Sequence, residues 1–216
     1  MGKKITRAQE LSRHAYRRAL TKAVREIAKG TDWRSIEGCL FCESKGWFIS
    51  ITPAVYVFDQ ITLARVTAKP MSVDPVFWDL VGLPENLSKP LSFRFNGAWT
   101  CRPPPLVEME VPEDPDPNVV AARILSIADS QRISVLAQLS MDAFIMLCRD
   151  RGQENDTYLP SLVFALIATG REGEAMAACK RAQAIGQIGG FLAPQGTFVE
   201  MALNWLSTRP DETTLH

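Results

Sequence analysis

Few residues in this 216-residue chain combine a type and a spacing that could do chemistry. The two histidines are His14, within a basic stretch, and His216 at the last position, and neither lies near a nucleophile-elbow motif. Cys39 and Cys42 have redox spacing, but alternation along a strand places their thiols on opposite faces or across a bulge, and not at a helix N-terminus, where a thiolate is stabilised. We therefore expect these cysteines to be structural.

Metal and nucleotide sites are not predicted either. Zinc would need a second Cys-x-x-Cys or a His pair, whereas the other cysteines stand singly, at Cys101, Cys148 and Cys179. There is no Walker loop, and no GxGxxG motif follows a predicted strand. The sequence thus predicts no catalytic residue, no metal site and no cofactor.

The strongest charge feature lies in the element that opens the chain. Residues 1–34 hold ten Lys/Arg against three Asp/Glu, although the formal net charge of the whole chain is zero. Thr6 and Gln9 form a capping-box pattern and Gly30 a stop, which together predict a helix of about six turns. Its apolar residues share one half of the helical wheel: Ala8, Ala15, Tyr16, Ala19, Leu20, Ala23 and Ile27. Its basic residues share the other half, which is suited to water or an anion: Arg7, Arg13, Arg17, Arg18, Lys22, Arg25 and Lys29.

Strand patterns follow this helix. Residues 36–43, 46–58 and 61–68 are rich in Ile, Val, Phe, Trp and Tyr, and residues 106–111 add a last strand. Pro53 implies an edge position, a bulge or two shorter strands within the second run. We expect a mainly antiparallel sheet.

A tight hairpin is predicted at Asn96-Gly97, because both residues accept the positive φ angles of a type I′ turn. The flanking strands are 91–95 and 98–101, and their register sets Arg94 opposite Trp99 in a cation–π contact. We expect both residues to contribute to partner binding.

Helical patterns dominate the remainder. Asp74-Pro75 predicts the start of a short helix, and the acidic, Pro-rich segment 112–118 reads as a linker. Five further helices are expected at 117–128, 133–149, 158–169, 172–185 and 197–206. The predicted class is α+β, with a helix-plus-antiparallel-sheet domain at 1–111, the linker at 112–118 and a helical domain at 119–216.

One helical pair carries a family resemblance. Ala165-Leu166, Gly170, Glu174-Ala175, Cys179 and Ala182 place small residues where two helices would cross closely, and the segment 159–185 resembles a tetratricopeptide unit. It lacks the usual aromatic at the Cys179 position, and ordinary helix packing explains the same residues. The resemblance implies peptide binding.

These patterns favour a non-catalytic protein that binds another macromolecule, most simply a protein. Aromatic residues crowd between Trp33 and Trp99, and a two-sided sheet cannot bury every one, so the rest suit protein recognition. The first alternative is nucleic-acid binding through Arg13, Arg17, Arg18, Lys22, Arg25 and Lys29. The second is an enzyme that uses the carboxylates of Asp74 and Asp79 or the thiols of Cys39 and Cys42. The odd number of scattered cysteines and the lack of a long apolar run favour the cytoplasm, away from membranes.

Overall fold

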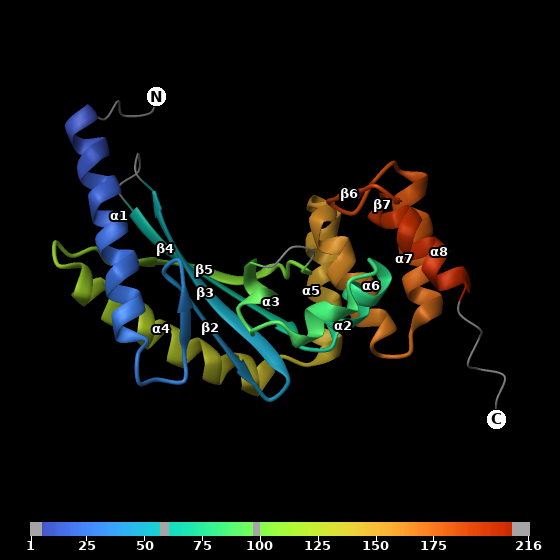
Figure 1. Ribbon diagram of the computed structural model, residues 1–216, viewed down its shortest axis with the longest axis horizontal. Coiled ribbons are helices and arrows are strands. Elements are labelled where there is room, and N and C mark those ends of the chain that lie inside the picture. Colours follow the sequence, from blue (N-terminus) through green and yellow to red (C-terminus); the bar gives the residue numbers. More distant parts are fainter. Residues whose placement is uncertain (1–5, 57–60, 97–99, 209–216) are drawn as a thin grey trace. The chain divides into compact units, whose positions relative to one another are not determined.

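The computed structural model describes residues 6–56, 61–96 and 100–208 (Figure 1). By its internal contacts the chain divides into two compact units. We call residues 1–68 with 105–139 the sheet unit, and residues 69–104 with 140–216 the helical unit. Each is described by itself.

The sheet unit contains a five-stranded sheet in the order β1-β2-β3-β4-β5. The strands are β1 (Arg34–Ile36), β2 (Cys39–Ser44), β3 (Trp47–Tyr56), β4 (Ile61–Pro70), whose last two residues belong to the helical unit, and β5 (Pro105–Val111). The pairs β1/β2, β2/β3 and β4/β5 are antiparallel. The expected α+β class with an antiparallel sheet is confirmed.

Two long helices cover one face of this sheet: α1 (Arg7–Ile27) and α4 (Pro117–Gln138). Alternate residues along the strands, such as Leu40 and Cys42 on β2, enter one apolar core with Leu20 and Val24 of α1 and with Ile124 of α4. Trp33 lies in the same core and donates its indole N–H to Asp129 Oδ1 at 2.9 Å. The capping box predicted at Thr6 and Gln9 is present at the start of α1. These contacts fix which side of α1 faces solvent.

The tight hairpins of the sheet lie at Glu37-Gly38 and Lys45-Gly46. All four residues have positive φ, between 48° and 81°, as a two-residue type I′ connection requires. Gly38 also lies against α1, where an added Cβ would stand 3.1 Å from Thr21 Cα. The strand predicted over 36–43 runs through the first of these turns, because Glu-Gly is a weaker hairpin signal than Asn-Gly.

The helical unit is built from short helices around an aromatic core. Its elements are α2 (Val73–Leu80), the 3₁₀ helix η1 (Pro84–Ser88), α3 (Phe93–Asn96), α5 (Met141–Glu154), the 3₁₀ helix η2 (Asp156–Tyr158), α6 (Leu159–Ile167), α7 (Glu172–Ala184), the two-residue strands β6 (Leu192–Ala193) and β7 (Gly196–Thr197), and α8 (Phe198–Thr208). Phe77 packs against Phe164 and Phe198, with ring centroids 5.3 and 6.4 Å away. The side chains of α6 are buried along its whole length.

Three local predictions are wrong. The segment predicted as strand 91–95 ends in the short helix α3, since Phe93 N–H and Arg94 N–H bond back to the carbonyls of Pro90 and Leu91. The predicted break between helices at 128 and 133 is absent, because α4 continues to Gln138. Helix α2 begins at Val73 with Ser72 as N-cap, so Asp74 lies in its first turn.

The domain boundaries expected at 111 and 119 separate parts that would fold on their own. This independent folding stays a prediction. In the compact units, the segment 112–118 and α4 group with the sheet, whereas 69–104 groups with the C-terminal helices. Across the described residues, no helix combines the length and the apolar character needed to cross a membrane.

Candidate functional site

The outward side of α1 carries a line of exposed cations. Leu20, Ala23 and Val24 face the core, which turns Arg18, Lys22 and Arg25 toward solvent. Their i, i+4, i+7 spacing places them on one line about 10 Å long, which we call the cationic stripe. Arg17, also exposed, flanks it. Among the residues that the structure describes, no acidic side chain forms an ion pair with any of these four.

Elsewhere most arginines are paired with acids inside the molecule. These pairs include Arg13–Glu113, Arg65–Glu108, Arg94–Asp74, Arg123–Asp114, Arg132–Asp32, Arg149–Glu174 and Arg171–Asp142. Lys29, two residues after the end of α1, pairs with Glu26, and this contact lowers the pKa of the Glu26 carboxyl. The cationic stripe therefore stands apart from the internal ion pairs.

Arg13, predicted as part of the basic binding face, is bonded to other residues of the sheet unit. Its guanidinium donates to both carboxylate oxygens of Glu113 at 2.7 Å and to the carbonyl of Tyr56 at 3.3 Å. Thr62 Oγ1 donates to the same carboxylate at 3.0 Å. Glu113 belongs to the acidic segment 112–118, which is predicted to be an exposed linker, so these contacts hold that segment on the sheet unit.

Arg94 is also engaged inside the molecule. It donates to Asp74 Oδ2 and to the Met71 carbonyl, both at 3.1 Å, and its guanidinium lies 5.1 Å from the Trp78 ring centroid. The predicted partner, Trp99, lies outside the described residues. Trp78 thus supplies a cation–π contact that the hairpin register had assigned to Trp99.

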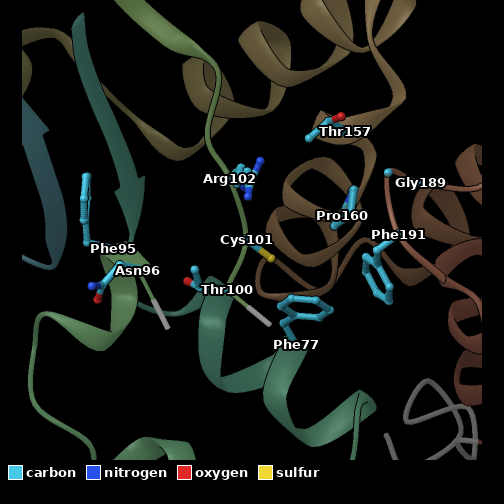
Figure 2. Close-up of a pocket in the computed structure, with 11 residues that line it drawn as sticks. Phe77, Phe95, Asn96, Thr100, Cys101, Arg102, Thr157, Pro160, Gly189 and Phe191 are labelled. Carbon is cyan, nitrogen blue, oxygen red and sulfur yellow. The ribbon is translucent and has the colours of Figure 1, made fainter. Parts of the chain in front are cut away.

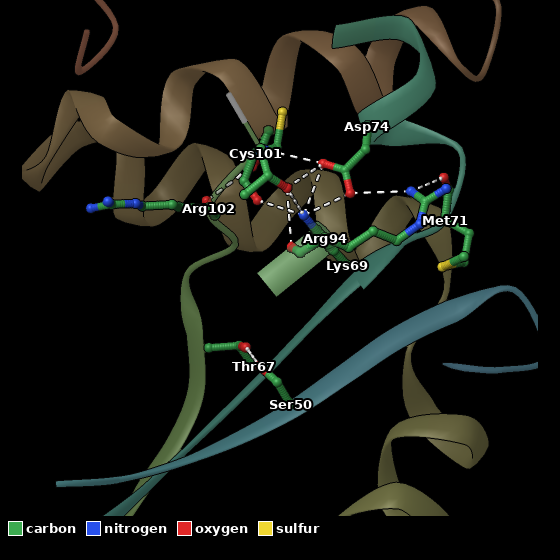
Figure 3. A network of polar contacts seen from close by, with 10 residues as sticks. Ser50, Thr67, Lys69, Met71, Asp74, Arg94, Cys101 and Arg102 are labelled. Carbon is green, nitrogen blue, oxygen red and sulfur yellow. Dashed lines mark hydrogen bonds and ion pairs between the residues drawn. The ribbon is translucent and has the colours of Figure 1, made fainter. Parts of the chain in front are cut away.

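Asp74 and Lys69 form a buried ion pair at the centre of a polar network (Figure 3). The two side chains are 0% and 1% exposed. Lys69 Nζ donates to Asp74 Oδ1 at 2.8 Å, to Thr100 Oγ1 at 2.6 Å and to the Cys101 carbonyl at 2.9 Å. Asp74 Oδ1 also accepts from Thr100 Oγ1 and from the Cys101 N–H. The network is thus saturated by its own members, which suits a clamp better than a proton-transfer centre.

A cavity of about 260 Å³ opens beside this clamp (Figure 2). Thr100 and Cys101 form one wall and Gly189 with Gly190 another, while Phe77 and Phe191 supply aromatic rings. Arg102, which is exposed, also lines the cavity. Sequence reasoning missed the cavity, because its lining residues come from distant segments. It also missed the clamp, for which a lysine after an apolar strand and an aspartate in the next helix were visible signals.

The residues proposed for catalysis are not brought together. Asp74 is committed to the clamp, and Asp79 is exposed. All five cysteines are free and buried. Desolvation raises the pKa of the Cys42 thiol to about 11 and also raises that of Cys39, which opposes thiolate formation. Within the described ranges, no group of three or more His, Cys, Asp or Glu side chains could hold a metal ion.

The aromatic side chains of the first hundred residues are mostly inside. Trp33, Phe77 and Trp78 are at most 3% exposed, whereas Tyr56 is 39% exposed. Phe58 lies outside the described residues. Trp47, Phe93 and Phe95 are half-buried, so part of their surface is accessible together with that of Tyr56.

The fold and these sites define an α+β chain with an exposed cationic helix on its sheet unit and a small cavity in its helical unit. The chain matches no protein-family model, no curated protein and no solved structure. Helices α6 and α7 pack against each other, with Ala175, Cys179 and Ala182 buried. The comparisons give the tetratricopeptide resemblance no support, and the peptide binding that it implies stays a prediction.

Proposed function

We propose that this chain is a non-catalytic binding protein that docks an acidic surface of another protein through the cationic stripe of α1. The observation that carries the proposal is the set of exposed, unpaired cations on one line of a helix whose opposite side is buried. Complementary charge steers and orients such an encounter. Arg17 flanks the stripe, and Lys29, which pairs with Glu26, follows the end of the helix on the same side.

A protein partner fits the stripe better than a nucleic acid. Binding to a duplex usually engages more phosphates than the three or four that this line can reach, and the chain has no net positive charge to hold it there. Four phosphate contacts would give a slope of about −3.6 in log K against log salt concentration. Nucleic-acid binding remains the second candidate, supported by the same arginines.

A cytoplasmic site of action belongs to the proposal. It is supported by five free, buried cysteines, which suit a reducing compartment. It is testable by fractionating the source cells.

The test compares two variants with the same change in net charge. R18E/K22E/R25E reverses the stripe, and K89E/K180E/R181E reverses exposed cations of the helical unit. Immobilised wild-type chain and both variants are exposed to nuclease-treated lysate of the source cells, and each captured protein is then purified and titrated by calorimetry. We expect a direct protein partner with an acidic surface, whose affinity falls roughly tenfold or more with the stripe variant only.

Two results would overturn this function. One is a partner that binds the stripe variant as tightly as the wild type. The other is a partner that is captured from untreated lysate but not from nuclease-treated lysate, together with binding of a 20-base-pair duplex at the predicted salt slope, which would establish nucleic-acid binding instead.

A further inference from the structure

We propose that the cavity of the helical unit is a binding site for a small aromatic carboxylate, independent of the docking function of α1. The size of the cavity sets the first limit on its ligand. A 150 Å³ apolar cavity accepts benzene, so about 260 Å³ admits one ring with a short acidic arm. A nucleotide is too large.

The ring-binding part of the cavity is aromatic. Phe77 and Phe191 both line it, and their ring centroids lie 5.5 Å apart at an interplanar angle of 51°. Phe77 is 2% exposed and is fixed by Phe164 behind it. The cavity is thus lined by aromatic surface, against which an aromatic ligand packs more favourably than a saturated ring of similar size.

The charge of the cavity selects an anion. Arg102 is the charged residue among its described lining residues, and no described acidic side chain pairs with it. The Arg102 carbonyl accepts a hydrogen bond from Ser161 Oγ at 2.9 Å, which holds the backbone while leaving the guanidinium available. A guanidinium presents two parallel N–H donors, the geometry that a carboxylate matches. Asn96 and Thr157 add polar groups to the lining.

Both side walls are set before any ligand arrives. Thr100 and Cys101 are held by Lys69 and Asp74 of the clamp (Figure 3). On the other side, Asp156 Oδ2 accepts from Gly189 N–H at 3.2 Å.

The two glycines of that second wall allow the chain to pass close to its neighbours. An added Cβ at Gly189 would lie 2.4 Å from Phe198, and one at Gly190 would lie 2.7 Å from Thr157 Cα. Walls fixed in this way reduce the ordering cost of binding.

The experiment titrates the full chain with benzoate, phenylacetate, benzamide and cyclohexanecarboxylate, followed by ligand-observed NMR and calorimetry. We expect an aromatic carboxylate to bind at least tenfold more tightly than benzamide or cyclohexanecarboxylate. R102Q should remove that advantage over benzamide, and R181Q, at an exposed arginine of α7, should leave it intact. Because the Arg102 side chain is exposed, R102Q should melt like the wild type.

A second variant, F191L, separates ring recognition from charge recognition. It should reduce the preference for benzoate over cyclohexanecarboxylate while benzoate keeps its advantage over benzamide. Three results would each overturn the proposal. The first is that neither benzoate nor phenylacetate binds, and the second is that benzoate and benzamide bind equally tightly. The third is that R102Q binds benzoate as tightly as the wild type does. None of these results depends on the partner of α1.

Discussion

Replacing Asp74 with Asn tests whether the buried clamp holds the helical unit together. The carboxylate accepts from Lys69, Arg94, Thr100 and the Cys101 N–H. The Asn amide keeps one acceptor oxygen. Its NH₂ group replaces the other oxygen and therefore faces groups that donate hydrogen bonds to Asp74. It also leaves the Lys69 ammonium, 1% exposed, without its counter-charge.

The expected loss follows from that uncompensated charge. Removing one member of a buried ion pair costs about 3–5 kcal/mol, which for a chain of this length lowers Tm by roughly 6–20 °C. K69M should cost less, because Asp74 keeps Arg94 at 3.1 Å and two further donors. The double variant K69M/D74N should be more stable than D74N, since it removes the stranded ammonium.

The assay is urea unfolding of the full chain, followed by circular dichroism and by tryptophan fluorescence, with coincidence of the two curves as the check on two-state behaviour. D150N, the same chemical change at an exposed site of α5, is the matched control and should stay within about 0.5 kcal/mol of wild type. The reasoning fails if D74N lies within about 1 kcal/mol of wild type, or if the losses of the two single variants simply add.

Three further predictions concern the thiols, the hairpins and the acid limb of stability. Iodoacetamide at pH 7 should modify the native cysteines more slowly than free cysteine and should reach them in urea, since burial raises their pKa values; one fast native thiol, seen by mass spectrometry, would contradict this. G38A should lower the free energy of unfolding more than G46A does, because both glycines have positive φ but only Gly38 contacts α1; equal losses in denaturant titrations would count against that contact. Hydrogen bonds from Arg171 and Arg149 lower the pKa of Glu174 to about 2, so stability present above its ordinary pKa of 4.5 should decline as the pH falls toward 2. E174Q should flatten that decline in melting curves, and an unchanged pH profile would refute the assignment.

Local sequence patterns predicted the sheet, because the apolar residues that define each strand pattern are also the residues that the strand buries. The strands and the Thr6 capping box depend on neighbours close in sequence, and the structure contains both. The strand predicted over 91–95 is wrong for the opposite reason, while Gly97 of the predicted turn lies outside the described residues. Arg94 is held by Asp74, twenty positions earlier, and Phe93 packs on Trp78, so tertiary contacts fix a helical turn where the turn signal favoured a strand.

The candidate sites also differ in whether they depend on local periodicity or on contacts between distant residues. The cations of α1 follow from helical periodicity, so the exposed position of Arg18, Lys22 and Arg25 could be predicted. The engagement of Arg13 with Glu113 could not, because the two residues are 100 positions apart. The cavity depends on Thr100, Gly190 and Phe191 meeting from distant segments, and no spacing rule connects them.

Both units are discontinuous in sequence, and this limits how the protein can be truncated. A fragment that stops at residue 111 would keep α1 and all five strands but would lose α4, whose Val120 and Ile124 fill the shared core. Its sheet would expose the apolar face that α4 covers, which favours aggregation. The complementary fragment, residues 112–216, would lack Lys69 and Asp74. Separate production of either half therefore calls for joining its two pieces with a short designed loop, not for truncation.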